Sequence, residues 1–332
     1  MTIHTHTLES AALRGNRFND PTTRALHVYT PPDYDPARRY PALYLLASHG
    51  NTGESLLNWR AYHESLPARL DRLMGAEGVP PALVVLPDTW TALGSSQYLN
   101  STIGNYEDYL LQDVIPFVEA HYPADPAARG VLGHSSGGYG AIVQAMRHPE
   151  IFQAVASHAG DMYFEYTCLP LLAKLHQNLA RFGGAAAFLA DVAAVEPKGG
   201  AFWETIMALC WAMAHASNPQ APLGFDMPID ETTGALREDV WQRWLAFDPL
   251  RILETLAAQE ALRGMAAVYL SAGAYDEYQA QVGARLFSRR LNEVGIPHTY
   301  EEPPTGHSGA DVPYDASIRL LAAALSARQA MS

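Results

Sequence analysis

The sequence predicts an α/β fold: a mostly parallel central sheet flanked by helices, with a block of helices inserted before the last strands. Short apolar runs rich in β-branched residues alternate with longer segments of helical spacing, which is typical of parallel strands joined by crossover helices. Residues 40–47 and 81–88 are apolar almost throughout, as expected of strands covered on both faces. Between residues 162 and 247 the alternation stops, and helix-compatible segments follow one another.

The composition is that of a globular protein with an acidic surface. The 332 residues are 48% hydrophobic and 17% charged, enough apolar material to bury a large core, and the formal net charge at pH 7 is −13. Such a charge repels nucleic acid and anionic membrane surfaces, so neither is expected as a partner. A neutral or cationic small molecule suits it better, and a homo-oligomer stays open.

The cysteines and the N-terminus are compatible with a reducing compartment. Cys168 and Cys210 are the only cysteines, too few for a disulfide framework. Residues 1–9 lack a basic region followed by an apolar core, and no run of 18 apolar residues occurs, so we expect a cytoplasmic protein without an export signal in the chain as given. His4 and His6 lack a third ligand nearby, which favours a frayed terminus over a metal site.

The first half of the chain alternates predicted strands with predicted helices. Strands are expected at residues 26–30, 40–47, 81–88 and 128–132. A proline-rich turn separates the first two, which predicts that they are neighbours in the sheet. One helix is expected through Leu66, Leu70 and Leu73, ending at Gly75 or Gly78. A second is expected onward from an Asn105 cap, with a break where Pro116 removes a backbone donor.

The second half contains the helical segment. After a strand at 154–158, helices are expected at 169–182, 185–195, 202–216 and 237–246. Helices without strands between them suggest an insertion over the sheet edge, so we divide the chain into a core at 1–161, a helical cap at 162–247 and the rest of the core at 248–332. The last part is predicted to hold a helix near 248–261, a strand at 266–273, a helix over 282–294, a strand at 298–302 and a helix at 318–327.

Residues 128–140 predict a strand, a sharp turn and a helix, with a Gly-x-Ser-x-Gly pattern formed by Gly133, Ser135 and Gly137 at the turn. A serine there has strained backbone and a projecting hydroxyl, and the two glycines leave out side chains that would collide. The helix that begins at Ser136 points unpaired N–H groups and its positive dipole end at an oxyanion beside Ser135. We therefore interpret Ser135 as a nucleophile.

A serine nucleophile needs a base within hydrogen-bond reach, and that base needs a carboxylate to orient it. Asp276 follows one predicted strand and His307 follows the next, which gives Ser, Asp and His in the order found in α/β-hydrolase folds. If the strands are parallel, all three side chains lie on one rim of the sheet. Asp161, after an earlier strand, is the rival acid, and Glu277 is expected to point to the other side of its turn.

Acyl chemistry also needs two backbone donors for the oxyanion. The N–H of Ser136, directly after the nucleophile, is the first. The second is expected from the loop after the 40–47 strand, where we favour the amide of Asn51 and keep that of Gly50 as an alternative.

The chain resembles the esterase D / enterochelin-esterase-like family of α/β-hydrolases, which includes feruloyl esterases and mycolyltransferases. The resemblance covers about residues 20–160 and 262–325 and is carried by His49-Gly50-Asn51, residues 104–109, residues 133–140, Asp276 and Gly306-His307. It implies an ester hydrolase that works through an acyl-serine without a metal or organic cofactor. Ser136, where a larger apolar residue is common, and the long insertion both depart from the family, so its substrates do not carry over.

These observations together predict a serine esterase with a triad of Ser135, His307 and Asp276, acting on a small-molecule carboxylic ester. Aromatic residues of the cap are expected to form an apolar wall for the acyl or aryl part of the substrate: Tyr163, Phe164, Trp203 and Trp211. Two alternatives stay open. The same triad supports acyl transfer to an alcohol, and an inert binding module could keep the same fold.

Overall fold

The computed structural model describes residues 2–57, 61–307 and 313–331. Within them lies an eight-stranded sheet in which every neighbouring pair from β4 to β10 is parallel, whereas β2 is antiparallel to both of its neighbours. In their order across the sheet, the strands are β1 (Thr2–Glu9), β2 (Thr23–Thr30), β4 (Leu83–Pro87), β3 (Tyr40–Leu46), β7 (Ala124–His134), β8 (Ala154–His158), β9 (Ala267–Ser271) and β10 (Thr299–Glu301). The predicted α/β fold with a mostly parallel sheet is confirmed.

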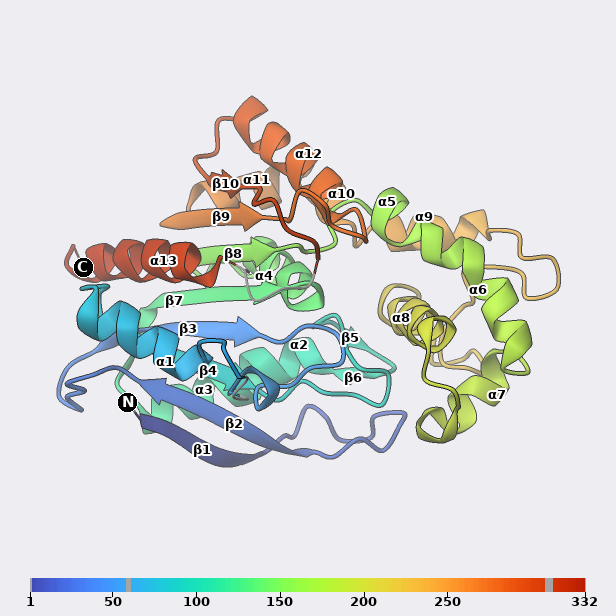
Figure 1. The fold of residues 1–332 in the computed structure, drawn as a ribbon, viewed down its shortest axis with the longest axis horizontal. Helices are drawn as coiled ribbons and strands as arrows, with labels where there is room; N and C mark the ends of the chain where they lie inside the picture. Colours follow the sequence, from blue (N-terminus) through green and yellow to red (C-terminus); the bar gives the residue numbers. More distant parts are fainter. Residues whose placement is uncertain (1, 58–60, 308–312, 332) are drawn as a thin grey trace.

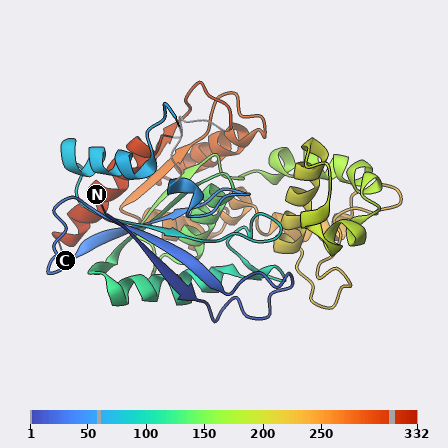
Figure 2. The same ribbon diagram turned by 60° about the horizontal axis from the view of Figure 1, so that its bottom comes forward.

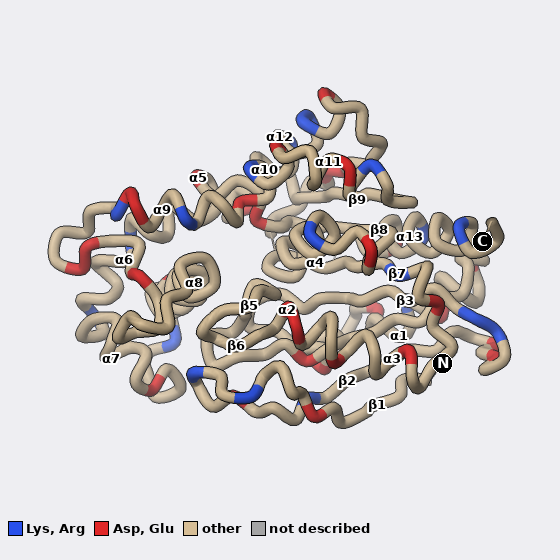
Figure 3. Tube along the Cα trace, turned by 180° about the vertical axis from the view of Figure 1, so that it is seen from behind, with Lys and Arg blue, Asp and Glu red and all other residues tan. Residues whose placement is uncertain are grey.

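The central strands are apolar because helices cover both faces of the sheet (Figure 1). β3, β4 and β8 are buried along their whole length and contain no Asp, Glu, Lys or Arg. Charged residues of both signs lie instead on the surrounding segments and on the helical region at one side (Figure 3). The sheet can therefore carry polar side chains at its rim while its central strands are buried away from solvent.

The helices form one layer on each face of the sheet (Figure 2). α1 (Leu66–Asp71) and α13 (Tyr314–Gln329) pack on one face and share one apolar cluster with it. α3 (Ile115–His121), α4 (Ser136–Arg147) and α11 (Leu256–Arg263) pack on the other and belong to the larger cluster. Two further helices, α10 (Pro249–Ile252) and α12 (Ala280–Glu293), lie beside α4 and β9.

A lobe of helices lies between β8 and β9 in the sequence and projects on the side away from the two chain ends (Figure 1). It consists of α5 (Phe164–Thr167), α6 (Leu169–Arg181), α7 (Ala185–Ala190), the 3₁₀ turn η4 (Val192–Ala194), α8 (Gly200–His215) and α9 (Glu238–Leu245). Its apolar residues belong to the same buried cluster as one face of the sheet. The lobe thus lacks a separate core. Cys168 and Cys210 are buried in it as free thiols.

Two predictions about the sheet are wrong. Residues 2–9 are not a frayed terminus but strand β1, paired with β2 along its whole length, and His6 Nε2 lies 2.6 Å from the Tyr122 hydroxyl. The strands expected at 26–30 and 40–47 are not neighbours either, because β4 pairs with both β2 and β3 and separates them. The connection 31–39 therefore passes across β4 rather than forming a hairpin.

The helix after the small β5 (Asn100–Ser101) and β6 (Gly104–Asn105) ladder breaks as expected near Pro116. A short α2 (Tyr106–Asp108) leads into a π-helical turn, η3 (Tyr109–Val114), and α3 begins at Ile115. The wider turn accommodates the missing donor of Pro116. The expected Asn105 cap is wrong, since the Asp108 amide donates to Asn100 Oδ1 instead, at 3.1 Å.

The segment predicted as a single helix near 248–261 is divided into α10 and α11. Asp248 caps the first by accepting from the amides of Leu250 and Arg251. Thr255 caps the second by accepting from the amide of Ala258. Each cap pairs with amide donors that are otherwise unpaired at the start of a helix. Because a second helix begins within the segment, the apolar pattern does not correspond to one continuous helix.

The other helices agree with the sequence reading more closely. α1 begins at Leu66, where Ser65 caps it, and continues as a π-helical turn, η2 (Arg72–Ala76). α12 ends at Glu293, just before Gly295, whose φ of +67° terminates the segment. In the part of the chain that the structure describes, no helix is both long and apolar enough to cross a membrane.

Candidate active site

Ser135 lies on a strained turn between β7 and α4. Its φ of 57° and ψ of −122° are outside the helical and extended regions, so its side chain projects from the rim of the sheet. The neighbouring glycines are required by close backbone contacts: a Cβ on Gly133 would lie 2.5 Å from the Gly137 carbonyl oxygen, and one on Gly137 would lie 2.2 Å from that of Leu46. The sequence Gly-x-Ser-x-Gly therefore fits this turn sterically.

The structure brings Ser135, His307 and Asp276 together in a continuous hydrogen-bonded line. His307 Nε2 lies 2.9 Å from Ser135 Oγ, and His307 Nδ1 lies 2.7 Å from Asp276 Oδ2. The Asp276 side chain is completely buried, and its other oxygen accepts from the amide of Tyr278 at 2.8 Å. Both carboxylate oxygens are thus committed, which fixes the carboxylate plane against the imidazole.

Hydrogen bonds to both the amide and the carbonyl group of His307 hold the loop that carries it. The His307 amide donates to Glu277 Oε2 at 2.7 Å, and the His307 carbonyl accepts from His134 Nε2 at 2.8 Å. Glu277 therefore does not point to the other side of its turn as predicted: its carboxylate turns back to this loop, and the bond from His307 lowers its pKa. Ser308 and Gly309, part of the same sequence motif, lie outside the described residues.

His134 connects three rim loops. Burial lowers its pKa to about 4, so the ring is neutral at pH 7, and because Nε2 must donate to a carbonyl, Nδ1 is the acceptor. The hydroxyl of Ser48, in the loop after β3, lies 3.0 Å from His134 Nδ1. These contacts give His134 a structural role at the rim. His158 is more deeply buried and bonds Ser271 and Ser317, away from the triad.

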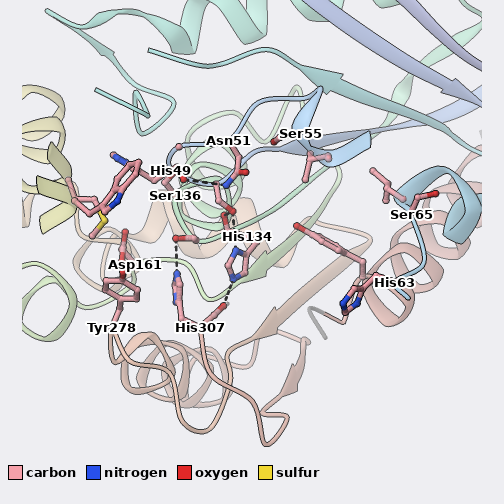
Figure 4. Close-up of a pocket in the computed structure, with 18 of the residues that line it drawn as sticks. His49, Asn51, Ser55, His63, Ser65, His134, Ser136, Asp161, Tyr278 and His307 are labelled. Carbon is pink, nitrogen blue, oxygen red and sulfur yellow. Dashed lines mark hydrogen bonds between the residues drawn. The ribbon is translucent and has the colours of Figure 1, made fainter. Parts of the chain in front are cut away.

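A cavity of about 670 Å³ has Ser135 and His307 among its lining residues (Figure 4). This volume suits a drug-sized molecule. It lies between the rim loops and α8, and residues from the loop before α1 and from α13 complete it. The lining comprises Ser48, His49, Gly50, Asn51, Ser55, Leu56, His63, Glu64, Ser65, Leu66, His134, Ser135, Ser136, Asp161, Trp203, Met207, Trp211, Tyr278, His307 and Tyr314.

Two of the four predicted wall residues line this cavity. Trp203 and Trp211 stand on one face of α8, the first 46% exposed and the second 4% exposed. Tyr163 and Phe164 were predicted wrongly, because the backbone turns them elsewhere: Tyr163 stacks on Tyr166, and Phe164 is fully buried against Tyr139 and His215.

Met207 and Tyr278 are among the lining residues that sequence reasoning missed. Met207 lies between the tryptophans of α8 at spacings of four residues, which places all three on one helical face. This periodicity is a signal that could have identified Met207. Tyr278, two residues after Asp276, packs edge-on against the His307 ring at 4.6 Å between centroids. No local pattern marks it, because its position depends on the fold of the His307 loop.

The amides predicted to bind the oxyanion differ in the hydrogen bonds that they donate in this structure. The Ser136 amide is in the first turn of α4, where a helix offers it no acceptor of its own. The Asn51 amide donates to the Ser48 carbonyl at 3.0 Å, and the Gly50 amide donates to the Gly94 carbonyl at 2.8 Å. The Ser136 hydroxyl, which departs from the family pattern, is buried 3.0 Å from the Ser95 hydroxyl. In the described ranges, no group of three or more His, Cys, Asp or Glu could hold a metal ion.

Comparison with known proteins identifies the family of this chain. A family model described as "Putative esterase" matches residues 17–296. The chain belongs to this Esterase family. The sequence resemblance to esterase D-like hydrolases is thereby confirmed.

Curated relatives of this Esterase-family chain come from bacteria and mammals. Esterase Rv1288 of Mycobacterium tuberculosis is 25% identical over 290 residues, covering 85% of this chain and 52% of the relative. The S-formylglutathione hydrolase of Mus musculus is 26% identical over 141 residues, covering 40% of this chain and 50% of the relative. The chain thus spans about half the length of the curated relatives it matches.

Solved structures agree in fold with this member of the Esterase family. A ferulic acid esterase superposes with a TM-score of 0.62 at 18% identity, covering 98% of each chain. The S-formylglutathione hydrolase from Agrobacterium tumefaciens superposes with a TM-score of 0.57 at 15% identity, covering 97% of this chain and 95% of the other. The fold is the α/β-hydrolase fold.

Proposed function

We propose that this chain is a carboxylic-ester hydrolase that works through an acyl-serine intermediate on Ser135. The observation that carries the proposal is the line from Asp276 Oδ2 through both nitrogens of His307 to Ser135 Oγ, at 2.7 and 2.9 Å. This arrangement is the one in which a base activates a serine while a carboxylate orients the base. Membership of the Esterase family supports the same reaction.

In the proposed reaction, His307 Nε2 takes the proton of Ser135 as Oγ attacks the acyl carbon. A tetrahedral oxyanion forms, and the Asp276 carboxylate stabilises the imidazolium. The intermediate collapses when His307 returns the proton to the alcohol oxygen, which leaves, and Ser135 keeps the acyl group. Water, deprotonated by His307, then attacks the acyl carbon. The bond from that carbon to Ser135 Oγ breaks, the acid leaves, and Oγ takes the proton back from His307.

The oxyanion is proposed to bind the amides of Ser136 and Asn51. The Ser136 amide has no acceptor within its helix and lies directly after the nucleophile. The Asn51 amide now closes a turn onto the Ser48 carbonyl. It would serve the oxyanion by sharing its hydrogen between the Ser48 carbonyl and the oxyanion in a three-centre bond. The second donor of the oxyanion hole would therefore act only when substrate is bound.

A fluorophosphonate probe tests this function directly. It should add once, at Ser135, as read by intact mass and peptide mapping, and should abolish hydrolysis of a phenyl ester in step with labelling. Product analysis in the presence of methanol separates hydrolysis from acyl transfer. A protein that neither takes the label nor cleaves any ester in a panel of varied acyl and alcohol parts would be an inert binding module.

Trp203 and Trp211 should respond differently to truncation. Trp203→Ala is expected to change the ratio of kcat/KM between a short and a bulky ester by about tenfold, since it truncates a half-exposed pocket wall, with little change in melting temperature. Trp211→Ala should change the ratio too, but also lower the free energy of unfolding by about 3–5 kcal/mol because its ring is buried. Equal loss on every ester and a large fall in melting temperature for Trp203→Ala would assign that side chain to the core.

A further inference from the structure

A buried carboxyl group lines the catalytic cavity without taking part in the triad. Asp161 follows β8, is 7% exposed and belongs to the cavity wall. Asp276 already occupies Nδ1 of His307, so Asp161 has no role in orienting the base. Figure 4 shows it beside Tyr278, on the same side of the pocket as His307. A buried ionised carboxyl group at such a position destabilises the folded protein unless a partner group compensates its charge.

Asp161 has polar neighbours but, among the described residues, no Lys or Arg that forms an ion pair with it. Burial raises its pKa to about 6. His307 favours the ionised form, and the uncharged side chains of Gln97 and Thr167 add to this effect. At pH 8 the group is thus a carboxylate without a Lys or Arg partner in the part of the chain that the structure describes.

The described residues of the cavity wall do not neutralise this charge. None of the lining residues that the structure describes is Lys or Arg. Among them, one other carboxylate stands outside the triad, that of Glu64, and its Oε2 lies 2.7 Å from the Arg72 guanidinium, which lowers its pKa. Asp161 is therefore the carboxylate with which an incoming group can pair.

We propose that Asp161 determines substrate specificity by receiving a positively charged group of the substrate, so that the preferred esters carry an ammonium group on the part that extends toward α8 and Tyr278. This inference rests on the proposed esterase function. Hydrogen bonds between an ammonium and a carboxylate are shorter and stronger than neutral ones, and the burial of Asp161 increases their effect. Anionic esters are correspondingly disfavoured, in keeping with the net charge of −13.

The test uses pairs of esters that differ only in the end of one chain. In each pair an ω-ammonium group replaces a terminal methyl, on an acyl chain or on an alkoxy chain, with several chain lengths for each. Wild-type enzyme at pH 8 should prefer the ammonium member by about tenfold in kcat/KM at the length that reaches Asp161. The side that shows the preference identifies whether the acyl or the alkoxy part points to Asp161.

The pH dependence of this preference needs no variant. Because the pKa of Asp161 is raised to about 6, the carboxylate is present above that pH and lost below it, while the ammonium stays charged throughout. The preference should therefore fall at least fivefold between pH 8 and pH 5. The chemical step at Ser135 is the same for both members of a pair, so its own pH dependence cancels in the ratio. The titratable groups that interact with Asp161 are His307, Asp276, Tyr278, Tyr139 and Cys168, and burial raises the pKa of the last three, so they stay neutral.

Asp161→Asn should reduce the preference to about one at every pH while the methyl-ended ester loses no more than about tenfold. Fluorophosphonate labelling of Ser135 in the variant verifies that its site is folded. Glu64→Gln is the matched control: it removes another carboxylate of the cavity lining, one that Arg72 already neutralises, and should keep the preference.

Three results would overturn the proposal. A wild type that hydrolyses the neutral esters and takes the label, yet shows no preference for any ammonium member, would leave the esterase function standing alone. A preference that persists in Asp161→Asn but disappears in Glu64→Gln would assign the cation to Glu64. Absence of both labelling and hydrolysis in the wild type would remove the esterase function and this inference with it.

Discussion

Replacing Ser135 with alanine is expected to lower kcat on an activated aryl ester by on the order of 10³-fold or more. The substitution deletes one oxygen atom, the one that lies 2.9 Å from His307 Nε2. Alanine has the same Cβ as serine, so the strained φ of 57° and its supporting glycines are unaffected. The loss should consequently be in chemistry and not in folding.

Initial rates and fluorophosphonate labelling measure this effect, and circular dichroism with thermal melting verifies the fold. Ser136→Ala is the matched control, because it removes the adjacent hydroxyl, which bonds Ser95, but keeps the amide that we assign to the oxyanion. That control should still take the label. If Ser135→Ala kept half of the wild-type rate, another nucleophile would be at work.

The sequence could predict the parallel part of the sheet because burial on both faces leaves a continuous apolar signal. β3 and β8 are of this kind. β1 gave no such signal: it pairs on one side only, and six of its eight residues are polar. An edge strand with Thr, His and Glu resembles a polar terminus, and only its pairing with β2 makes it a strand.

The same contrast holds for the candidate site. Ser135, Asp276 and His307 were identifiable because each follows a predicted strand, and parallel strands end on one rim. Which face of a helix meets the cavity depends on how α8 packs, so Trp203 could not be distinguished from Phe164 by aromatic content. The contacts of Glu277 and His134 with the His307 loop join segments distant in sequence, and no local pattern encodes them.

Asp276→Asn is expected to lower kcat by as much as about 10⁴-fold, although the substitution preserves shape. Asp276 Oδ1 accepts from the Tyr278 amide, so an asparagine keeps that bond by placing its own oxygen there and its NH₂ group toward His307. His307 Nδ1 must then accept, which puts the ring proton on Nε2. The nitrogen that faces Ser135 Oγ can no longer take its proton, and the charge that stabilises the imidazolium is lost.

The measurement compares this variant with substitutions at the two other acids near His307, on one neutral ester. Glu277→Gln keeps an oxygen for the His307 amide, and Asp161→Asn changes a group that does not touch the imidazole, so each should cost about tenfold or less. Labelling rates with the fluorophosphonate should follow the same order, since Ser135 must be deprotonated to react. A near-normal Asp276→Asn enzyme beside a crippled Asp161→Asn enzyme would move the triad acid to the loop after β8.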